Sequence, residues 1–187
     1  MRCMESYSRH YDKITNTTAE HKKQFYESAT QNILSQLEKF GLSPEDKRKA
    51  VFYTKLFREA FKYDEIKKHI FITPESKIWD LKYDSAGFCR IASITFAIIM
   101  GIKEWQLMCI GEKDWNGSAS HHYLKHLPSG KFFDITYDQF AFEGHDIPYD
   151  LGHSAVVGLT PGDMTLKFAD TLDIDLLKIL KGKTKGK

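Results

Sequence analysis

The chain has no apolar run long enough to cross a bilayer and no apolar stretch near its first residues. It begins with the polar segment MRCMESYSRHYDK, whereas a secretory signal needs an apolar h-region there. The most apolar run, at 94–100, is far shorter than the roughly 20 residues that a membrane helix needs. The sequence therefore predicts neither a secretory signal nor a membrane-spanning segment.

Cysteine and net charge are also scarce. The 187 residues include three cysteines, Cys3, Cys89 and Cys109, and this odd, widely spaced set does not suit a disulfide framework. It favours a reducing compartment, so the predicted location is cytoplasmic. The formal net charge is only +2, which gives no electrostatic reason to expect nucleic acid or a membrane as a partner.

The overall composition is that of an ordinary globular protein. Hydrophobic residues make up 42% of the chain and charged residues 28%. A chain of this length fits one domain and buries a substantial core without disulfides. We expect a single α+β domain, 1–187, with an N-terminal helical hairpin at 18–63, a core of catalytic type at 84–170 and a flexible basic tail at 181–187.

Two amphipathic segments predict the N-terminal hairpin. At 18–40 the apolar residues recur at spacings of three and four, and Gly41 suits the position after a helix end. Ser43-Pro44-Glu45-Asp46 then has a serine N-cap, a proline at the first helical position and acids in the first turn. This second helix is expected to run to residue 63 and to bury Phe52 and Phe57. The charged faces of both helices are interpreted as solvated surface without a function.

The rest of the chain alternates short apolar runs with turn residues, which indicates a sheet and further helices. The apolar run that begins at Cys89 predicts a helix, because it is long and Gly101 ends it. The predicted elements after the hairpin are a strand at 69–73, a helix at 89–100, strands at 105–110, 120–127, 131–137 and 164–168, and a helix at 171–180. One α+β domain accounts for this order.

Cys89 stands at the start of the predicted apolar helix, directly after Asp84-Ser85-Ala86-Gly87-Phe88. The thiolate is the nucleophilic form of cysteine, and a helix N-terminus lowers the pKa of a thiol. The small residues before Cys89 favour a tight turn that exposes its sulfur, with its N–H forming half of an oxyanion hole. The alternative is a buried structural cysteine, which is what Cys109 is expected to be within its apolar strand.

A histidine pair and an aspartate supply the other residue types that thiol catalysis needs. His121 and His122 are adjacent on a predicted strand, so only one of them is expected to face Cys89. A three-residue loop at Pro128-Ser129-Gly130 would pair Leu127 with Lys131. It would also set Leu124 opposite Asp134, on the same face as His122, whereas a two-residue loop would place Asp134 on the face of His121. We prefer His122 as the base, with His121 as the alternative and Asp134 as the residue that orients the imidazole.

A group of five histidines raises the alternative of a metal site. The chain has no HExxH and no paired CxxC, and the spacings match no standard zinc ligand set. Neither a metal nor another cofactor is therefore expected. The five histidines are His121, His122, His126, His145 and His153.

The stretch 84–140 resembles the small bacterial YunG-type family, which belongs with the papain-like and transglutaminase-like Cys–His–Asp proteins. The motifs that carry the resemblance are Gly87-x-Cys89, His122-Tyr123 and Leu127-x-x-Gly130-x-x-x-Asp134-Ile135-Thr136-x-x-Gln139-Phe140. It implies a papain-like or transglutaminase-like core, a helix carrying the cysteine packed on an antiparallel sheet, with Cys89 as nucleophile, His122 as base and Asp134 as orienter. The chain departs from the family at Leu124-Lys125, where an aromatic residue and an asparagine are usual.

Two further residues are candidates for support. Papain-like enzymes often place a glutamine before the cysteine as a second oxyanion donor, but no glutamine lies between Phe71 and Cys89. Ser85 or a backbone amide would have to supply that hydrogen bond. Gln139 follows Asp134 closely and is expected to close the back of the site.

These patterns predict a thiol-dependent hydrolase or acyltransferase that acts on an amide bond of a protein, peptide or small amide. Peptidase, amidase, glutamine deamidase and transglutaminase activities all remain open, because fold analogy does not choose a substrate. The alternative is a non-catalytic binding module on the same fold, with the N-terminal hairpin as its partner surface. The sequence carries no signal for an oligomeric state.

Overall fold

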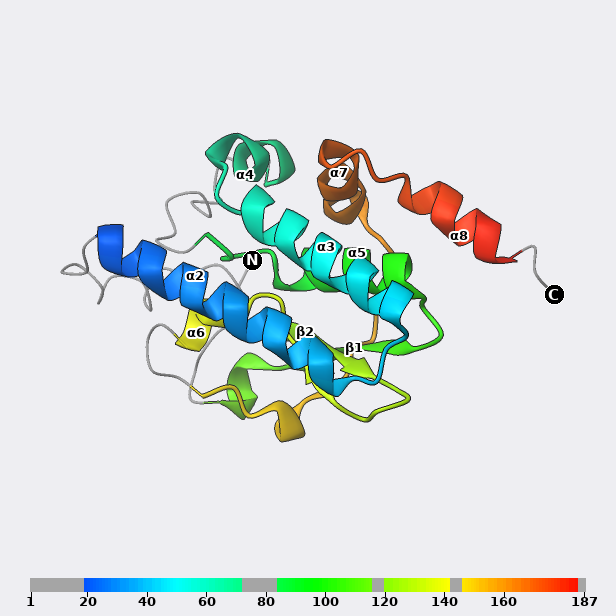
Figure 1. The fold of residues 1–187 in the computed structure, drawn as a ribbon, viewed down its shortest axis with the longest axis horizontal. Coiled ribbons are helices and arrows are strands. Elements are labelled where there is room, and N and C mark those ends of the chain that lie inside the picture. Colours follow the sequence, from blue (N-terminus) through cyan, green and yellow to red (C-terminus); the bar gives the residue numbers. More distant parts are fainter. Residues whose placement is uncertain (1–18, 72–83, 116–119, 142–145, 185–187) are drawn as a thin grey trace.

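The computed structural model describes residues 19–71, 84–115, 120–141 and 146–184, and these form an α+β fold with seven α-helices and a four-stranded antiparallel sheet (Figure 1). No helix within these ranges is long and apolar enough to cross a membrane. The α-helices are α2 (Ala19–Gln36), α3 (Pro44–Ala60), α4 (Asp64–Ile70), α5 (Cys89–Met100), α6 (Asp138–Ala141), α7 (Asp163–Thr171) and α8 (Leu176–Thr184), and the strands are β1 (Trp105–Ile110), β2 (His121–His126), β3 (Phe132–Phe133) and β4 (His153–Ser154).

The sheet has the strand order β3-β2-β1-β4, and its longest pairing joins β1 to β2. Alternate residues of these strands point to opposite faces. Leu107 and Leu124 lie on the face that packs against α5, whereas Met108 and Tyr123 belong to a second apolar cluster on the other face. Adjacent residues of β2 therefore point toward different clusters.

Helix α5 is the centre of the core. Every residue of it except Arg90 is buried, as its almost unbroken apolar sequence predicts. It packs against β1 and β2 on one side and against α3, α7 and α8 on the other. Gly101 ends it at a φ of 126°, a conformation that favours glycine. The predicted helix at 89–100 is confirmed.

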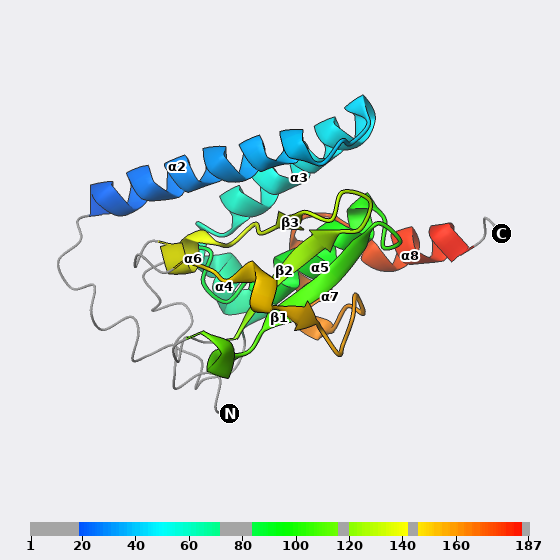
Figure 2. The same ribbon diagram turned by 90° about the horizontal axis from the view of Figure 1, so that it is seen from below.

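The N-terminal hairpin runs as two neighbouring helices along one side of the molecule (Figures 1 and 2). Ser43 caps α3, because its Oγ accepts a hydrogen bond from the Asp46 N–H at 3.1 Å. Phe57 is fully buried as predicted, whereas Phe52 is 59% exposed, so its place in the buried stripe was wrong. Phe61, just after α3, stacks on Phe88 with ring centroids 4.4 Å apart, which fixes the residue before Cys89.

Four predicted elements differ from the structure, and one of them, the strand at 131–137, is limited to Phe132–Phe133. Residues 64–70 are helical, so the strand at 69–73 was wrong within its described part, and residues 72–73 lie outside the described ranges. The segment predicted as a strand at 164–168 lies in α7, where Thr165, Phe168 and Ala169 form a buried stripe at helical spacing. The last helix begins at Leu176 and not at 171, because Asp173 has a φ of 56° and separates α7 from α8.

Candidate active site

Cys89 is the first residue of α5, and a turn at 84–87 precedes it. Gly87 has a φ of 81° in this turn, which explains why a glycine stands there. The first N–H groups of a helix have no intrahelical acceptor and point toward the space beyond the helix end. Cys89 is only 6% exposed, so the expectation of an exposed sulfur was wrong. Both described cysteines, Cys89 and Cys109, are free thiols.

Asp134 is bound to His121 and not to His122. The His121 Nε2 lies 2.5 Å from Asp134 Oδ2, and the two side chains are almost completely buried. Asp134 Oδ2 also accepts a hydrogen bond from the Tyr149 hydroxyl at 3.1 Å. The other oxygen, Oδ1, accepts from the N–H and the hydroxyl of Thr136 at 2.9 and 3.2 Å. Asp134 thus accepts hydrogen bonds from Tyr149 and Thr136 and fixes the Nε2 side of the His121 ring.

The register of the β2–β3 hairpin explains why Asp134 binds His121 and not the preferred His122. The prediction placed Leu124 opposite Asp134, but Leu124 pairs with Phe133, one residue away. A shift of one residue moves a side chain to the other face of a sheet, so Asp134 meets His121. The structure therefore has the stated alternative arrangement.

Both histidines nevertheless lie close enough to Cys89 to change its pKa, although only one was expected to reach it. Burial raises the pKa of the Cys89 thiol, but the hydrogen bonds and positive charges of His121 and His122 outweigh burial and lower that pKa to about 5. Burial lowers the pKa of His121, but the charge and hydrogen bond of Asp134, with a smaller effect of Cys89, raise it to about 10. The site thus favours a thiolate beside an imidazolium.

His122 lies on the face of β2 that packs against α5, directly opposite Cys109 on β1. Burial lowers its pKa, whereas hydrogen bonds with Cys109 and Cys89 raise it to about 9. His122 is half-buried, whereas His121 is fully buried. Of the two histidines beside Cys89, His121 is therefore fully buried and His122 is half-buried.

The two predicted supporting residues have different surroundings. Gln139 is at the back of His121, as expected: its Nε2 donates to the Thr136 carbonyl at 3.1 Å and lies 3.4 Å from His121 Nδ1. Its buried Oε1 has no hydrogen-bond partner. Ser85 is fully buried and donates its hydroxyl to Asp138 Oδ2 at 2.9 Å, so this hydroxyl is not free to serve an oxyanion.

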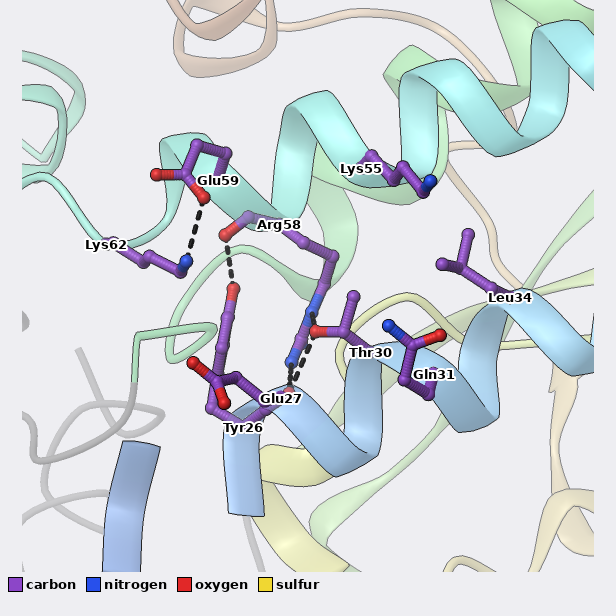
Figure 3. A pocket seen from close by; sticks show the side chains of 9 residues that line it. All are labelled: Tyr26, Glu27, Thr30, Gln31, Leu34, Lys55, Arg58, Glu59 and Lys62. Carbon is purple, nitrogen blue, oxygen red and sulfur yellow. Dashed lines mark hydrogen bonds and ion pairs between the residues drawn. The ribbon is translucent and has the colours of Figure 1, made fainter. Parts of the chain in front are cut away.

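A buried ion pair that the sequence did not indicate joins the hairpin to this site. Arg58 Nη1 of α3 lies 2.6 Å from Asp138 Oδ1 and donates to the Ile135 carbonyl at 3.2 Å. Figure 3 shows the same side chain against α2, where its Nε and Nη2 donate to the Thr30 hydroxyl and the Tyr26 carbonyl. Arg58 is buried, so the expectation that the charged residues of the hairpin are solvated was wrong for this residue. Because Asp138 also binds Ser85, the pair connects the hairpin to the turn before Cys89.

Four of the five histidines of the alternative metal site lie in the described ranges. Among the described residues, no group of three or more His, Cys, Asp or Glu side chains is arranged to hold a metal ion. His126 packs against Trp105 with ring centroids 4.7 Å apart, and His153 is exposed on the edge strand β4. Cys3, His145 and residues 185–187 of the predicted tail lie outside the described residues.

Comparison of the chain with protein-family models, curated proteins and solved structures found no match. The chemistry of Cys89, His121 and Asp134 therefore rests on their geometry and surroundings.

Proposed function

We propose that the protein is a thiol-dependent hydrolase or acyltransferase that acts on an amide bond. The observation that carries the proposal is the position of Cys89 at the N-terminus of α5, beside a histidine, His121, that binds the buried carboxylate of Asp134 and lowers the pKa of the thiol. In this scheme Cys89 is the nucleophile, His121 the acid and base, and Asp134 the residue that orients the imidazole. The core would be papain-like or transglutaminase-like, as the resemblance to the YunG-type family implies.

The contacts of His121 indicate which of its ring nitrogens transfers protons in each step. Nε2 of His121 is bound to Asp134, so the scheme assigns proton transfer to Nδ1, which also lies 3.4 Å from the Gln139 amide nitrogen. The Cys89 thiolate attacks the amide carbon, a C–S bond forms, and the carbonyl electron pair moves onto oxygen. The C–N bond then breaks as Nδ1–H protonates the leaving amine, which leaves an acyl thioester on Cys89. Water or an acceptor amine gives a proton to Nδ1, attacks the thioester and releases the thiolate.

The first test is the pH dependence of Cys89 alkylation by iodoacetamide, followed by peptide mass spectrometry in the full chain with Cys89→Ala as control. The rate at Cys89 should fall by half near pH 5, whereas an ordinary thiol such as glutathione loses half its rate near pH 8.5. The intrinsic reactivity of a thiolate decreases with its pKa, so the expected advantage over glutathione is largest at low pH and is about tenfold at pH 6. A midpoint above pH 8 would refute the proposed nucleophile.

The substrate class is tested next with peptide amides and glutamine-containing peptides, read by release of amine or ammonia. Activity that disappears in Cys89→Ala is expected with one of these groups. A peptidase would cleave the main chain, whereas a deamidase or transglutaminase would release ammonia from the glutamine side chain.

A second candidate is a non-catalytic binding module on the same fold, which the low exposure of Cys89 favours. It predicts that iodoacetamide reaches Cys89 only upon unfolding. Labelling of the native protein within minutes at pH 6, with unchanged circular dichroism, would rule this candidate out.

A further inference from the structure

The proposed reaction places negative charge on the carbonyl oxygen, and one hydrogen-bond donor to that oxygen is still unaccounted for. The Cys89 N–H at the helix start supplies one donor. Ser85 is occupied by Asp138, and Gln139, which is 1% exposed, already donates to Thr136. Neither of the two predicted supporting side chains is therefore placed to contact a substrate.

His122 meets the requirements for this donor. It lies on the face of β2 that packs against α5, the opposite face to His121, and it is half-buried. Its pKa responds to the two thiols, Cys89 and Cys109, whereas the carboxylate of Asp134 binds His121. It is therefore not needed to orient the acid and base, and a substrate carbonyl that reaches the sulfur from the α5 side of β2 would meet it.

The raised pKa of His122 keeps it an imidazolium at neutral pH, with two N–H groups to donate. Before attack the negative charge is on the sulfur of Cys89, and after attack it is on the oxygen bonded to the adjacent carbon. A donor that lies beside the sulfur therefore also lies beside that oxygen. Cys109 fixes the other side of the ring, so it acts as a positioning residue.

We propose that His122 is a second catalytic histidine, which donates a hydrogen bond to the oxyanion while His121 transfers protons. This inference rests on the proposed function, because it requires Cys89 to attack a carbonyl group. The two adjacent histidines then have separate roles that follow from the opposite faces of one strand.

The experiment compares two reactions of the same sulfur in the full chain. Iodoacetamide alkylation forms a C–S bond and releases iodide without an oxyanion, whereas acylation by 4-nitrophenyl acetate passes through negative charge on the carbonyl oxygen and releases coloured 4-nitrophenolate. Both rate constants are measured on the pH plateau where Cys89 is fully thiolate, for wild type, His122→Gln and His122→Ala. Their ratio removes the effect of His122 on the thiolate itself.

The expected result is a fall in the acylation-to-alkylation ratio of about 100-fold in His122→Ala, the usual effect of losing one oxyanion donor. His122→Gln keeps an N–H donor without the charge, so its ratio should lie between those of wild type and His122→Ala. Circular dichroism checks the fold, and the glutamine variant preserves the test if the alanine variant does not fold. Equal falls in both rates, or an unchanged ratio, would overturn the role of His122 alone.

The proposed function fails in a different way. In that case wild-type Cys89 would titrate like an ordinary thiol and form no acyl adduct, which would overturn both proposals. A low alkylation midpoint and an acyl adduct in wild type, with an unchanged ratio in the His122 variants, would leave the proposed function intact.

Discussion

Replacing Arg58 by methionine tests whether the N-terminal hairpin is part of the site scaffold. The substitution keeps much of the aliphatic volume and removes a guanidinium that is 1% exposed. It leaves the carboxylate of Asp138 without its cation and removes the Arg58 donor from the Ile135 carbonyl, whereas the Tyr26 carbonyl keeps its hydrogen bond from the Thr30 hydroxyl. Removing one partner of a buried ion pair costs about 3–5 kcal/mol. This is a large part of the roughly 5–15 kcal/mol that stabilises a typical protein.

The assay is thermal unfolding followed by circular dichroism at pH 7. For a chain of this size each kcal/mol changes Tm by about 2–4 °C, so Arg58→Met should lower Tm by about 6–20 °C. The matched control is Lys62→Met, because the Lys62–Glu59 ion pair beside the same pocket is exposed at both ends (Figure 3). Exposed pairs contribute between zero and about 1 kcal/mol, so this control should change Tm by less than about 4 °C.

A double-mutant cycle with Asp138→Asn isolates the pair itself. The asparagine removes the buried charge and can still accept the hydrogen bond from Ser85. Adding Asp138→Asn to Arg58→Met should therefore restore part of the lost stability, with a coupling of about 1.5 kcal/mol or more. Additive effects, or a loss below about 1 kcal/mol in Arg58→Met, would refute the buried pair as the connection between hairpin and site.

Three further predictions concern the site. Acylation of Cys89 should decrease as pH falls through about 5, because the thiolate is protonated. It should decrease again above about pH 9, where His122 loses its proton. A stopped-flow rate profile from pH 4 to 10 measures both limits. Gly87→Ala should lower the free energy of unfolding in a urea titration by roughly 1–2 kcal/mol, because Gly87 has a positive φ. Gly182→Ala in α8 should not destabilise the protein, because the new methyl group meets no atom there. Tyr149→Phe removes a hydrogen bond to the carboxylate of Asp134 and should lower the free energy of unfolding by about 1.5–3 kcal/mol in the same titration. A loss below about 0.5 kcal/mol would contradict that contact.

Local patterns predicted the elements that local physics determines. The helix at 89–100 has a long apolar run and a glycine at its end, and the second helix of the hairpin has a serine cap that the structure confirms. The segment at 164–168 was ambiguous because its apolar pattern is short. Five residues are too few to distinguish a period of 2 from one of 3.6, and the buried stripe continues to Ala169.

The identity of the histidine bound to Asp134 depends on one residue of register, which loop composition did not decide. The turn after β2 is closed by a hydrogen bond from the Gly130 N–H to the His126 carbonyl, and His126 in turn donates to Lys131. This differs from the predicted pairing of Leu127 with Lys131. The strand at 131–137 also ends early, because Asp134 binds the Thr136 N–H of its own chain and starts a turn.

The Arg58–Asp138 pair joins residues 80 positions apart, and no local pattern connects them. A weak signal was present on α3, where Thr54, Arg58 and Phe61 follow one another at helical spacing and are all buried. An arginine in line with buried positions requires an acidic partner, because an isolated buried charge is very costly. The sequence could indicate that a partner exists but not which of the chain's acids it is.

The charges of the site explain why two adjacent histidines are present. A thiolate at Cys89 and a carboxylate at Asp134 place two negative charges in a buried region, and His121 as an imidazolium balances only one of them. When His122 is also protonated, the net charge of the four groups is zero, which lowers the cost of a thiolate at low exposure. A neutral residue at 122 leaves one excess negative charge, so it must raise the pKa of Cys89 as well as remove a donor. The alkylation midpoint of His122→Gln should therefore lie above that of wild type, and an unchanged midpoint would show that His121 alone sustains the thiolate.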